Sequence, residues 1–268
     1  MLCLITEKVT PGPVASAQGP RSRRKTAPHS FSSRMAPLRS IAYIDGFNLY
    51  YRAIDRRKAT GLQLKWLDLG KLLRTMLPKN DILRIKYFTA PVDARPGDPL
   101  KPFRQQVYWR ALSTIPGLEI IKGIHRSRVR MVPSAPGATG QPLFVAVIQS
   151  VEKNSDVNLA SHLVHDGCTG AYDCAVLVSS DTDQITPLRM VKHLMHKKVI
   201  VLHPTRKLFP ELRNSADYCM EIRQRDIVAC QFPSTMRDAQ GTISIPGEWL
   251  ARGAPQATPP GPSKPWKR

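Results

Sequence analysis

The chain is poor in acidic residues and has no long apolar run. Its 268 residues include 20 Asp and Glu against 40 Lys and Arg. No apolar stretch approaches the roughly 18 residues that a membrane-spanning helix needs. The five cysteines form no C-x-x-C pair, and their odd number and irregular spacing argue against a disulfide framework or a structural zinc site. These absences predict a soluble protein of a reducing, cytoplasmic compartment, with no membrane segment.

The formal net charge of +20 and the pI of about 10.2 are the strongest features of the composition. Residues 1–40 account for +6 of this charge and residues 248–268 for +3, so +11 remains on the rest of the chain. A body that is itself basic produces a field that attracts polyanions. Composition therefore favours nucleic acid, an anionic membrane surface or an acidic protein as the partner.

Both ends of the chain have compositions that do not support a packed core. Residues 1–39 are rich in Pro, Ser, Gly and Arg without apolar periodicity, which predicts disorder. This leader resembles an organelle transit peptide, or it is an extension upstream of a start at Met35, which we favour because Met35 directly precedes the first predicted strand. Trp249 is expected to anchor a late extended run on the body. The expected parts are a leader over 1–39, a main domain over 40–225, an extension packed on it over 226–250 and a disordered Pro-rich basic tail over 251–268.

Short apolar strands alternate with segments of helical periodicity along the main domain. This alternation implies parallel pairing with right-handed crossovers, and hence an α/β three-layer sandwich with a mostly parallel central sheet, Rossmann-like in plan. We expect strands over 41–44, 82–92, 118–124, 174–179, 199–203 and 216–222. Helices are expected from 48 and over 66–77, 102–115, 156–165 and 186–196. A hairpin is expected to pair 126–132 with 142–149. Within the helix over 102–115, the inward side chains are expected to be Phe103, Val107, Ala111 and Leu112.

Aspartates stand where several of these elements begin or end. Asp45 ends the first strand, and Asp181 and Asp183 follow the strand over 174–179. Asp156 opens a helix behind Ser155, which we expect to be its N-cap. Ligands of open α/β sheets bind beyond the carboxyl ends of the strands, so these aspartates are expected to converge there.

Carboxylates gathered in one cleft raise one another's pKa unless a cation lies among them. Ligands that are all oxygen select Mg²⁺ or Mn²⁺ over Zn²⁺, and such ions hold a phosphate and activate water. Each aspartate alone also has an ordinary structural explanation as a cap or turn residue. Their convergence on one sheet edge, inside a basic shell, favours the hydrolysis of a nucleic-acid phosphodiester.

Five short motifs occur in an order that resembles the NYN domain family, a branch of the PIN-like ribonucleases that includes LabA-type bacterial proteins. The resemblance spans roughly Ile41 to Ile222. The motifs read I-D-G-F-N at 44–48, K-N-S-D-V at 153–157, S-S-D-T-D at 179–183, K-V-I-V-L-H-P at 198–204 and A-D at 216–217.

The resemblance implies a PIN-like fold that binds Mg²⁺ or Mn²⁺ and hydrolyses RNA. It implies that Asn48 orients the substrate or a coordinating carboxylate. The metal-binding and catalytic acids that it implies are Asp45, Asp156, Asp181 and Asp183.

Three positions depart from the family pattern. Asn154 replaces the usual Gly, His162 stands where many relatives have a second Asp, and Gln184 replaces an apolar residue. The change at His162 leaves open whether the site holds one metal ion or two.

Basic residues are expected to flank the RNA path. Residues four apart on a helix share a face, and alternate residues of a strand point the same way. The expected nucleic-acid contacts are Arg52 and Arg56 on a helix, Arg126, Arg128 and Arg130 on an extended segment, and Lys153 close to the bound phosphate.

The main alternative is an RNA-binding or scaffold module with the same fold and little or no catalysis. Haloacid-dehalogenase-type phosphatases and nucleotide-sugar transferases also use an Asp-x-Asp after a strand, but neither gives a role to Asp45 and Asp156. The sequence leaves open RNA against DNA, endonuclease against exonuclease action, and the oligomeric state.

Overall fold

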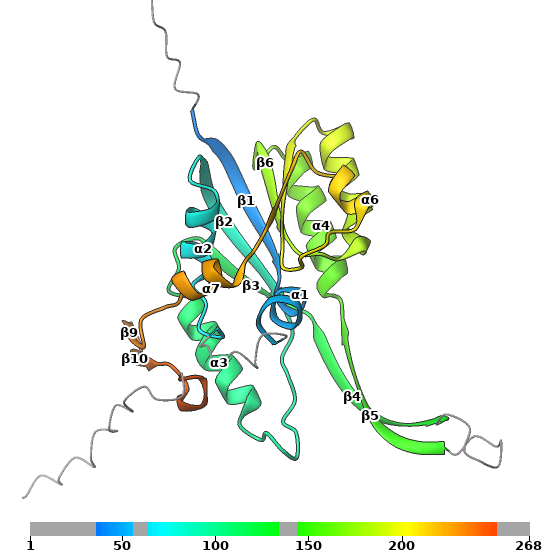
Figure 1. Cartoon of the computed structure of the whole chain (residues 1–268), viewed down its shortest axis with the longest axis vertical. Coiled ribbons are helices and arrows are strands. Elements are labelled where there is room, and N and C mark those ends of the chain that lie inside the picture. The colour runs from blue at the N-terminus through cyan, green and yellow to red at the C-terminus, as the bar shows by residue number, and fades with distance from the viewer. Residues whose placement is uncertain (1–35, 56–63, 134–143, 251–268) are drawn as a thin grey trace, which may run out of the picture. The chain divides into compact units, whose positions relative to one another are not determined.

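The computed structural model describes residues 36–55, 64–133 and 144–250, with backbone alone for 125–127 and 148–152 (Figure 1). Its centre is a sheet of six parallel strands in the order β3-β2-β1-β6-β7-β8. The chain runs outward from β1 to one edge and then from β6 to the other, so the direction of winding switches between β1 and β6. The strands are β1 (Leu38–Asp45), β2 (Asn80–Thr89), β3 (Leu118–Lys122), β6 (Cys174–Val178), β7 (Lys198–His203) and β8 (Tyr218–Glu221).

Helices cover both faces of the sheet, which confirms the predicted three-layer α/β sandwich. Alternate residues of β1 face opposite layers: Ala42 and Ile44 pack in one core, and Ile41 and Tyr43 in the other. The first core takes in α1 (Gly46–Leu49), a π-helical turn (Tyr50–Ile54), α2 (Leu69–Met76), α3 (Lys101–Leu112) and α7 (Gln224–Ala229). The second takes in α4 (Ser155–Cys168), α5 (Ile185–Arg189), a π-helical turn (Met190–Leu194) and α6 (Pro210–Asn214).

The predicted hairpin is confirmed as the antiparallel pair of β4 (Ile124–Pro133) and β5 (Phe144–Lys153). Figure 1 shows this pair extending away from the central sheet. Arg128 and Arg130 are two residues apart on β4, so both point to the same face of the hairpin, and both are exposed. The hairpin therefore presents basic side chains at a distance from the sheet.

Two expectations for the helices over 66–77 and 102–115 are wrong in detail. Helix α2 begins only at Leu69, because Asp68 caps it with a hydrogen bond from the Lys71 backbone N–H at 2.8 Å. On α3, Phe103 is 62% exposed, while Ala111 and Leu112 are fully buried. The inward stripe of α3 therefore lies nearer its carboxyl end than the apolar pattern indicated.

The segment after β8 packs on the first core. It adds the hairpin of β9 (Thr235–Asp238) and β10 (Gly241–Ser244). The Trp249 ring lies 6.3 Å from the Trp66 ring and 6.2 Å from the Tyr108 ring, centroid to centroid. The described part of the chain contains no helix that is both long and apolar enough to span a bilayer. The cysteines within it, Cys168, Cys174, Cys219 and Cys230, are free thiols.

Candidate metal centre

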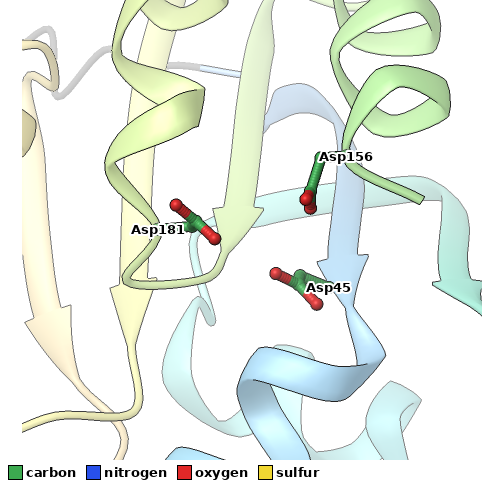
Figure 2. Close-up of side chains that lie close together, drawn as sticks. All are labelled: Asp45, Asp156 and Asp181. Carbon is green, nitrogen blue, oxygen red and sulfur yellow. The ribbon is translucent and has the colours of Figure 1, made fainter. Parts of the chain in front are cut away.

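Three aspartates from distant parts of the chain meet at the carboxyl edge of the sheet. Asp45 ends β1, Asp181 follows β6, and Asp156 lies in the first turn of α4. One carboxylate oxygen from each lies within 4.8 Å of the other two, and Figure 2 shows the side chains pointing into a shared space. Because β1 and β6 are neighbours, the site lies at the point where the winding of the sheet reverses, the usual ligand position in open α/β sheets.

Local hydrogen bonds fix the Asp45 carboxylate. Its Oδ1 accepts from the Asn48 backbone N–H at 2.9 Å, which caps α1, and its Oδ2 accepts from the Ser179 hydroxyl at 3.2 Å. A Cβ at Gly46 would lie 2.6 Å from the Tyr87 ring and 2.8 Å from the Phe88 carbonyl oxygen. Only glycine lets α1 begin this close to β2, so Gly46 sets the direction in which Asp45 leaves the sheet.

The loop that carries Asp181 is tied to α1 by Asn48. The Asn48 Oδ1 accepts from the Ser180 backbone N–H at 3.1 Å and from the Ser180 hydroxyl at 2.9 Å. The Ser179 hydroxyl also accepts from the Asp181 backbone N–H at 3.1 Å. Asn48 therefore holds the carboxyl ends of β1 and β6 in one arrangement.

Asn154 allows the sharp entry into α4 that positions Asp156. Its φ of 77° is left-handed, a conformation that asparagine tolerates better than most residues other than glycine. The turn is thus kept although Asn replaces the expected Gly. Helix α4 begins at Ser155 and its cap is Asn154, so the expectation that Ser155 is the N-cap is wrong. Asp156 lies in the first turn, where the helix dipole favours a negative charge.

The electrostatics of this group fit a divalent cation. Burial, together with the neighbouring carboxylates of Asp156 and Asp181, raises the pKa of Asp45 to about 7, against the lowering effect of the hydrogen bonds from Asn48 and Ser179. The Asp45 side chain thus carries its negative charge only at a cost. A cation bound among the three carboxylates would offset that cost, and an all-oxygen donor set suits Mg²⁺ or Mn²⁺.

Asp183 lies apart from these three. It is exposed, and its backbone N–H donates to the Asp181 Oδ1 at 3.1 Å. This bond belongs to a short 3₁₀ turn, Thr182–Gln184, which Asp181 caps. The expected role of Asp183 as a metal ligand stays a prediction.

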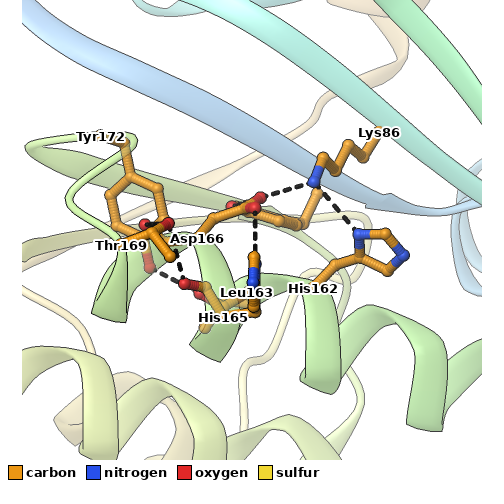
Figure 3. A network of polar contacts seen from close by, with 8 residues as sticks. Lys86, His162, Leu163, His165, Asp166, Thr169 and Tyr172 are labelled. Carbon is orange, nitrogen blue, oxygen red and sulfur yellow. Dashed lines mark hydrogen bonds and ion pairs between the residues drawn. The ribbon is translucent and has the colours of Figure 1, made fainter.

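His162 belongs to a polar network around Lys86 and Asp166 (Figure 3) and is not one of the three clustered carboxylate residues. The Lys86 ammonium, on β2, donates to the Asp166 Oδ2 at 2.6 Å and lies 3.1 Å from the His162 Nδ1. The Tyr43 hydroxyl, on β1, donates to the same Asp166 oxygen at 2.7 Å. Burial alone would raise the pKa of Asp166, but the bonds from Lys86 and Tyr43 outweigh it and lower that pKa. The network fastens α4, the helix that carries Asp156, to both strands.

Basic side chains flank the carboxylates on one side. Arg52 lines the same cavity as the three aspartates. A second cavity begins at Asp181 and Arg52 and continues along the loop after β7 to α6. Its cationic lining comes from Arg206, Lys207 and Arg213. Sequence analysis missed these three residues, although the loop after β7 leaves the same sheet edge as Asp45 and Asp181.

The other expected nucleic-acid contacts are only partly described. Arg128, Arg130 and Lys153 are exposed on the β4–β5 hairpin. Arg56 and the side chain of Arg126 lie outside the described residues.

Comparison with known proteins identifies the family. The NYN domain model matches residues 39–223. A protein named 6-hydroxy-3-succinoylpyridine 3-monooxygenase HspA, from Pseudomonas putida (strain DSM 28022 / S16), is 31% identical over 247 residues, which cover 81% of this chain and 77% of HspA. A solved structure of a Vibrio parahaemolyticus RIMD 2210633 protein of unknown function gives a TM-score of 0.45 at 18% identity, covering 70% of this chain and 95% of that one. The motifs and the domain match agree, and the chain belongs to the NYN domain family.

Proposed function

We propose that this protein is a metal-dependent ribonuclease. The observation that carries the proposal is the approach of the Asp45, Asp156 and Asp181 carboxylates to within 4.8 Å of one another at the switch point of the sheet. These three residues would hold Mg²⁺ or Mn²⁺, which supplies Lewis-acid chemistry at a phosphodiester. The family match and the net charge of +20 support a nucleic-acid substrate.

The side chains around the carboxylates then have distinct roles. Arg52, Arg206, Lys207 and Arg213 bind backbone phosphates on the Asp181 side of the site. Arg128, Arg130 and Lys153 on the β4–β5 hairpin contact the RNA farther along its path. Asn48 keeps the loop of Asp181 in register with Asp45 through its two hydrogen bonds to Ser180.

The test is RNA cleavage by purified protein with Mg²⁺, with Mn²⁺ and with EDTA, on single-stranded and structured RNA. We expect Asp181→Asn and EDTA each to abolish cleavage. Asp81→Asn is the matched control, because it makes the same chemical change at an exposed position near the opposite end of β2. Cleavage that survives in Asp181→Asn would overturn the proposal, and RNA binding without cleavage under every condition would favour the alternative of an RNA-binding module.

A second candidate comes from the 31% identity with a protein named as a monooxygenase of a hydroxypyridine. The observation that favours it is an aromatic-lined cavity beside the carboxylates, described below. The test is oxygen uptake by this protein in the presence of 6-hydroxy-3-succinoylpyridine and a reduced nicotinamide or flavin. Uptake that depends on the pyridine would favour this candidate, and uptake equal to that without the pyridine would exclude it.

A further inference from the structure

An aromatic cavity adjoins the candidate metal centre. It lies between α1, β2 and α3 and is closed by the last described segment of the chain. Phe47 and Tyr51 line both this cavity and the one that holds the three carboxylates, so the two lie next to each other. The other aromatic side chains around it are Tyr50, Tyr87, Tyr108, Trp109 and Trp249.

The rim between the two cavities presents a flat, accessible ring. The Phe47 and Tyr51 rings are stacked, with centroids 6.2 Å apart and planes at 12°. Tyr50 meets Tyr51 edge-on at 5.2 Å, which fixes the orientation of the Tyr51 ring. Tyr51 is nevertheless 47% exposed. A planar ligand can therefore stack on a tyrosine that is already held in place.

The inner wall is formed by groups whose hydrogen bonds are already made. The Tyr108 hydroxyl donates to the Leu67 carbonyl oxygen at 2.8 Å. The Gln105 amide donates to the Ala90 carbonyl oxygen and accepts from the Val92 N–H, both at 2.9 Å. These bonds make the cavity preformed, because no wall residue has to abandon a partner when a ligand enters.

Polar groups stand at the edge of the cavity as well as aromatic ones. The Arg104 side chain is only 12% exposed and pairs with Asp98 and with Glu248, the latter at 3.1 Å. The Lys65 ammonium lies 5.7 Å from the Trp249 ring centroid. A charged, polar edge of this kind suits a heteroaromatic ring with oxo or hydroxyl substituents better than a plain hydrocarbon.

The size of the cavity suits a single ring. Its volume is about 130 Å³, close to the ~150 Å³ cavity that admits benzene in another protein. We propose that this cavity binds a single six-membered heteroaromatic ring with oxo or hydroxyl substituents. If the proposed ribonuclease function holds, that ring is the pyrimidine base of the nucleotide next to the scissile phosphate. A free hydroxypyridine has the same ring chemistry.

The experiment is calorimetric titration of the full chain in EDTA, so that binding is measured without a contribution from a bound metal ion. The probes are UMP, AMP, ribose 5-phosphate and 6-hydroxy-3-succinoylpyridine. We expect UMP to bind about tenfold more tightly than AMP, because the second purine ring overfills the cavity. Ribose 5-phosphate has the sugar and phosphate but no base, so UMP should also bind more tightly than ribose 5-phosphate.

Tyr51→Ala should weaken UMP binding at least about fivefold, the lower end of losses measured when a stacking ring is removed. Trp249→Ala should do the same, and thermal melting shows whether that variant still folds. Tyr218→Ala is the matched control, since Tyr218 is 53% exposed on β8 and does not line the cavity. The proposal would be overturned if the hydroxypyridine does not bind and UMP binds no more tightly than ribose 5-phosphate or AMP, or if UMP binds but its affinity is unchanged in Tyr51→Ala.

The outcomes separate this site from the proposed function. UMP binding in EDTA without RNA cleavage in Mn²⁺ would support the ring site and reject the ribonuclease. RNA cleavage with no preference for UMP and no binding of the hydroxypyridine would support the ribonuclease and reject the ring site. Tight binding of the hydroxypyridine with no binding of UMP would support the ring site and assign it to a free small molecule.

Discussion

Replacing Asp45 by Asn should stabilise the metal-free protein at pH 8. The carboxylate is 6% exposed, and burial together with Asp156 and Asp181 raises its pKa from 3.8 to about 7. The folded protein therefore keeps a proton between about pH 4 and pH 7 that the unfolded chain has lost, so stability falls as pH rises through this window and is constant above it. The difference between the two pKa values corresponds to about 4 kcal/mol at 1.36 kcal/mol for each pKa unit.

Asparagine removes this cost because it does not ionise. Its side-chain oxygen still accepts from the Asn48 N–H, but its amide group no longer accepts from the Ser179 hydroxyl at Oδ2. Losing that bond costs about 1 kcal/mol or somewhat more, so we expect the free energy of unfolding at pH 8 to be about 2–3 kcal/mol higher in the variant than in the wild type. Near pH 4 the gain should vanish or reverse, because Asp45 is then neutral in the folded protein and only partly ionised in the unfolded chain, so little of the cost remains.

The assay is urea unfolding in EDTA at pH 4.5 and pH 8, followed by circular dichroism. Asp183→Asn is the control, since Asp183 is exposed and its substitution should change stability by less than about 0.5 kcal/mol. Adding Mn²⁺ should stabilise the wild type more than the Asp45→Asn variant, because the proposed site would bind the ion in the folded state through this carboxylate. A variant that is less stable than the wild type at pH 8 in EDTA would refute the reasoning.

Three further predictions concern the scaffold and the RNA contacts. Asp166→Asn should lower the free energy of unfolding in urea by about 3–5 kcal/mol, because it leaves the Lys86 ammonium buried without its carboxylate. Asp173→Asn is the control: Asp173 pairs with the exposed Arg39 at 3.9 Å, and its substitution should cost under about 1 kcal/mol. Gly46→Ala should lower the free energy of unfolding by about 1–3 kcal/mol and impair RNA cleavage, because the added Cβ collides with Tyr87. Gly97→Ala, whose Cβ meets nothing within 4 Å, should leave stability and cleavage unchanged. Converting Arg128 and Arg130 together to Ala should lower the slope of log affinity for single-stranded RNA against log salt by about 1.4 with no change in melting temperature; an unchanged slope would remove the hairpin from the RNA path.

The sequence predicted that the aspartates at the carboxyl ends of the strands lie close together. Asp45 and Asp181 follow apolar runs, and the carboxyl ends of neighbouring parallel strands share one edge of a sheet, so pattern alone indicates that they lie near each other. Asp183 lies five residues beyond β6, in the 3₁₀ turn that Asp181 caps, so the strand pattern alone does not report where its side chain lies.

Other features depend on contacts between distant residues, which periodicity does not report. Lys86 falls within an apolar strand, and its buried position is explained only by Asp166, 80 residues away. Arg206 and Lys207 occupy an irregular loop whose path is set by the packing of α6. The aromatic cavity joins Phe47 and Trp249, which stand near opposite ends of the described chain. Strand and helix order was therefore readable from the sequence, while cavity shape and charge pairing were not.

The most direct measurement of the central claim is the anomalous scattering of crystals grown or soaked with Mn²⁺. We predict a manganese peak bound by carboxylate oxygens of Asp45, Asp156 and Asp181 at about 2.0–2.3 Å, and its loss in Asp181→Asn crystals. A map without a peak among these three carboxylates, or with manganese bound to other residues alone, would contradict the account.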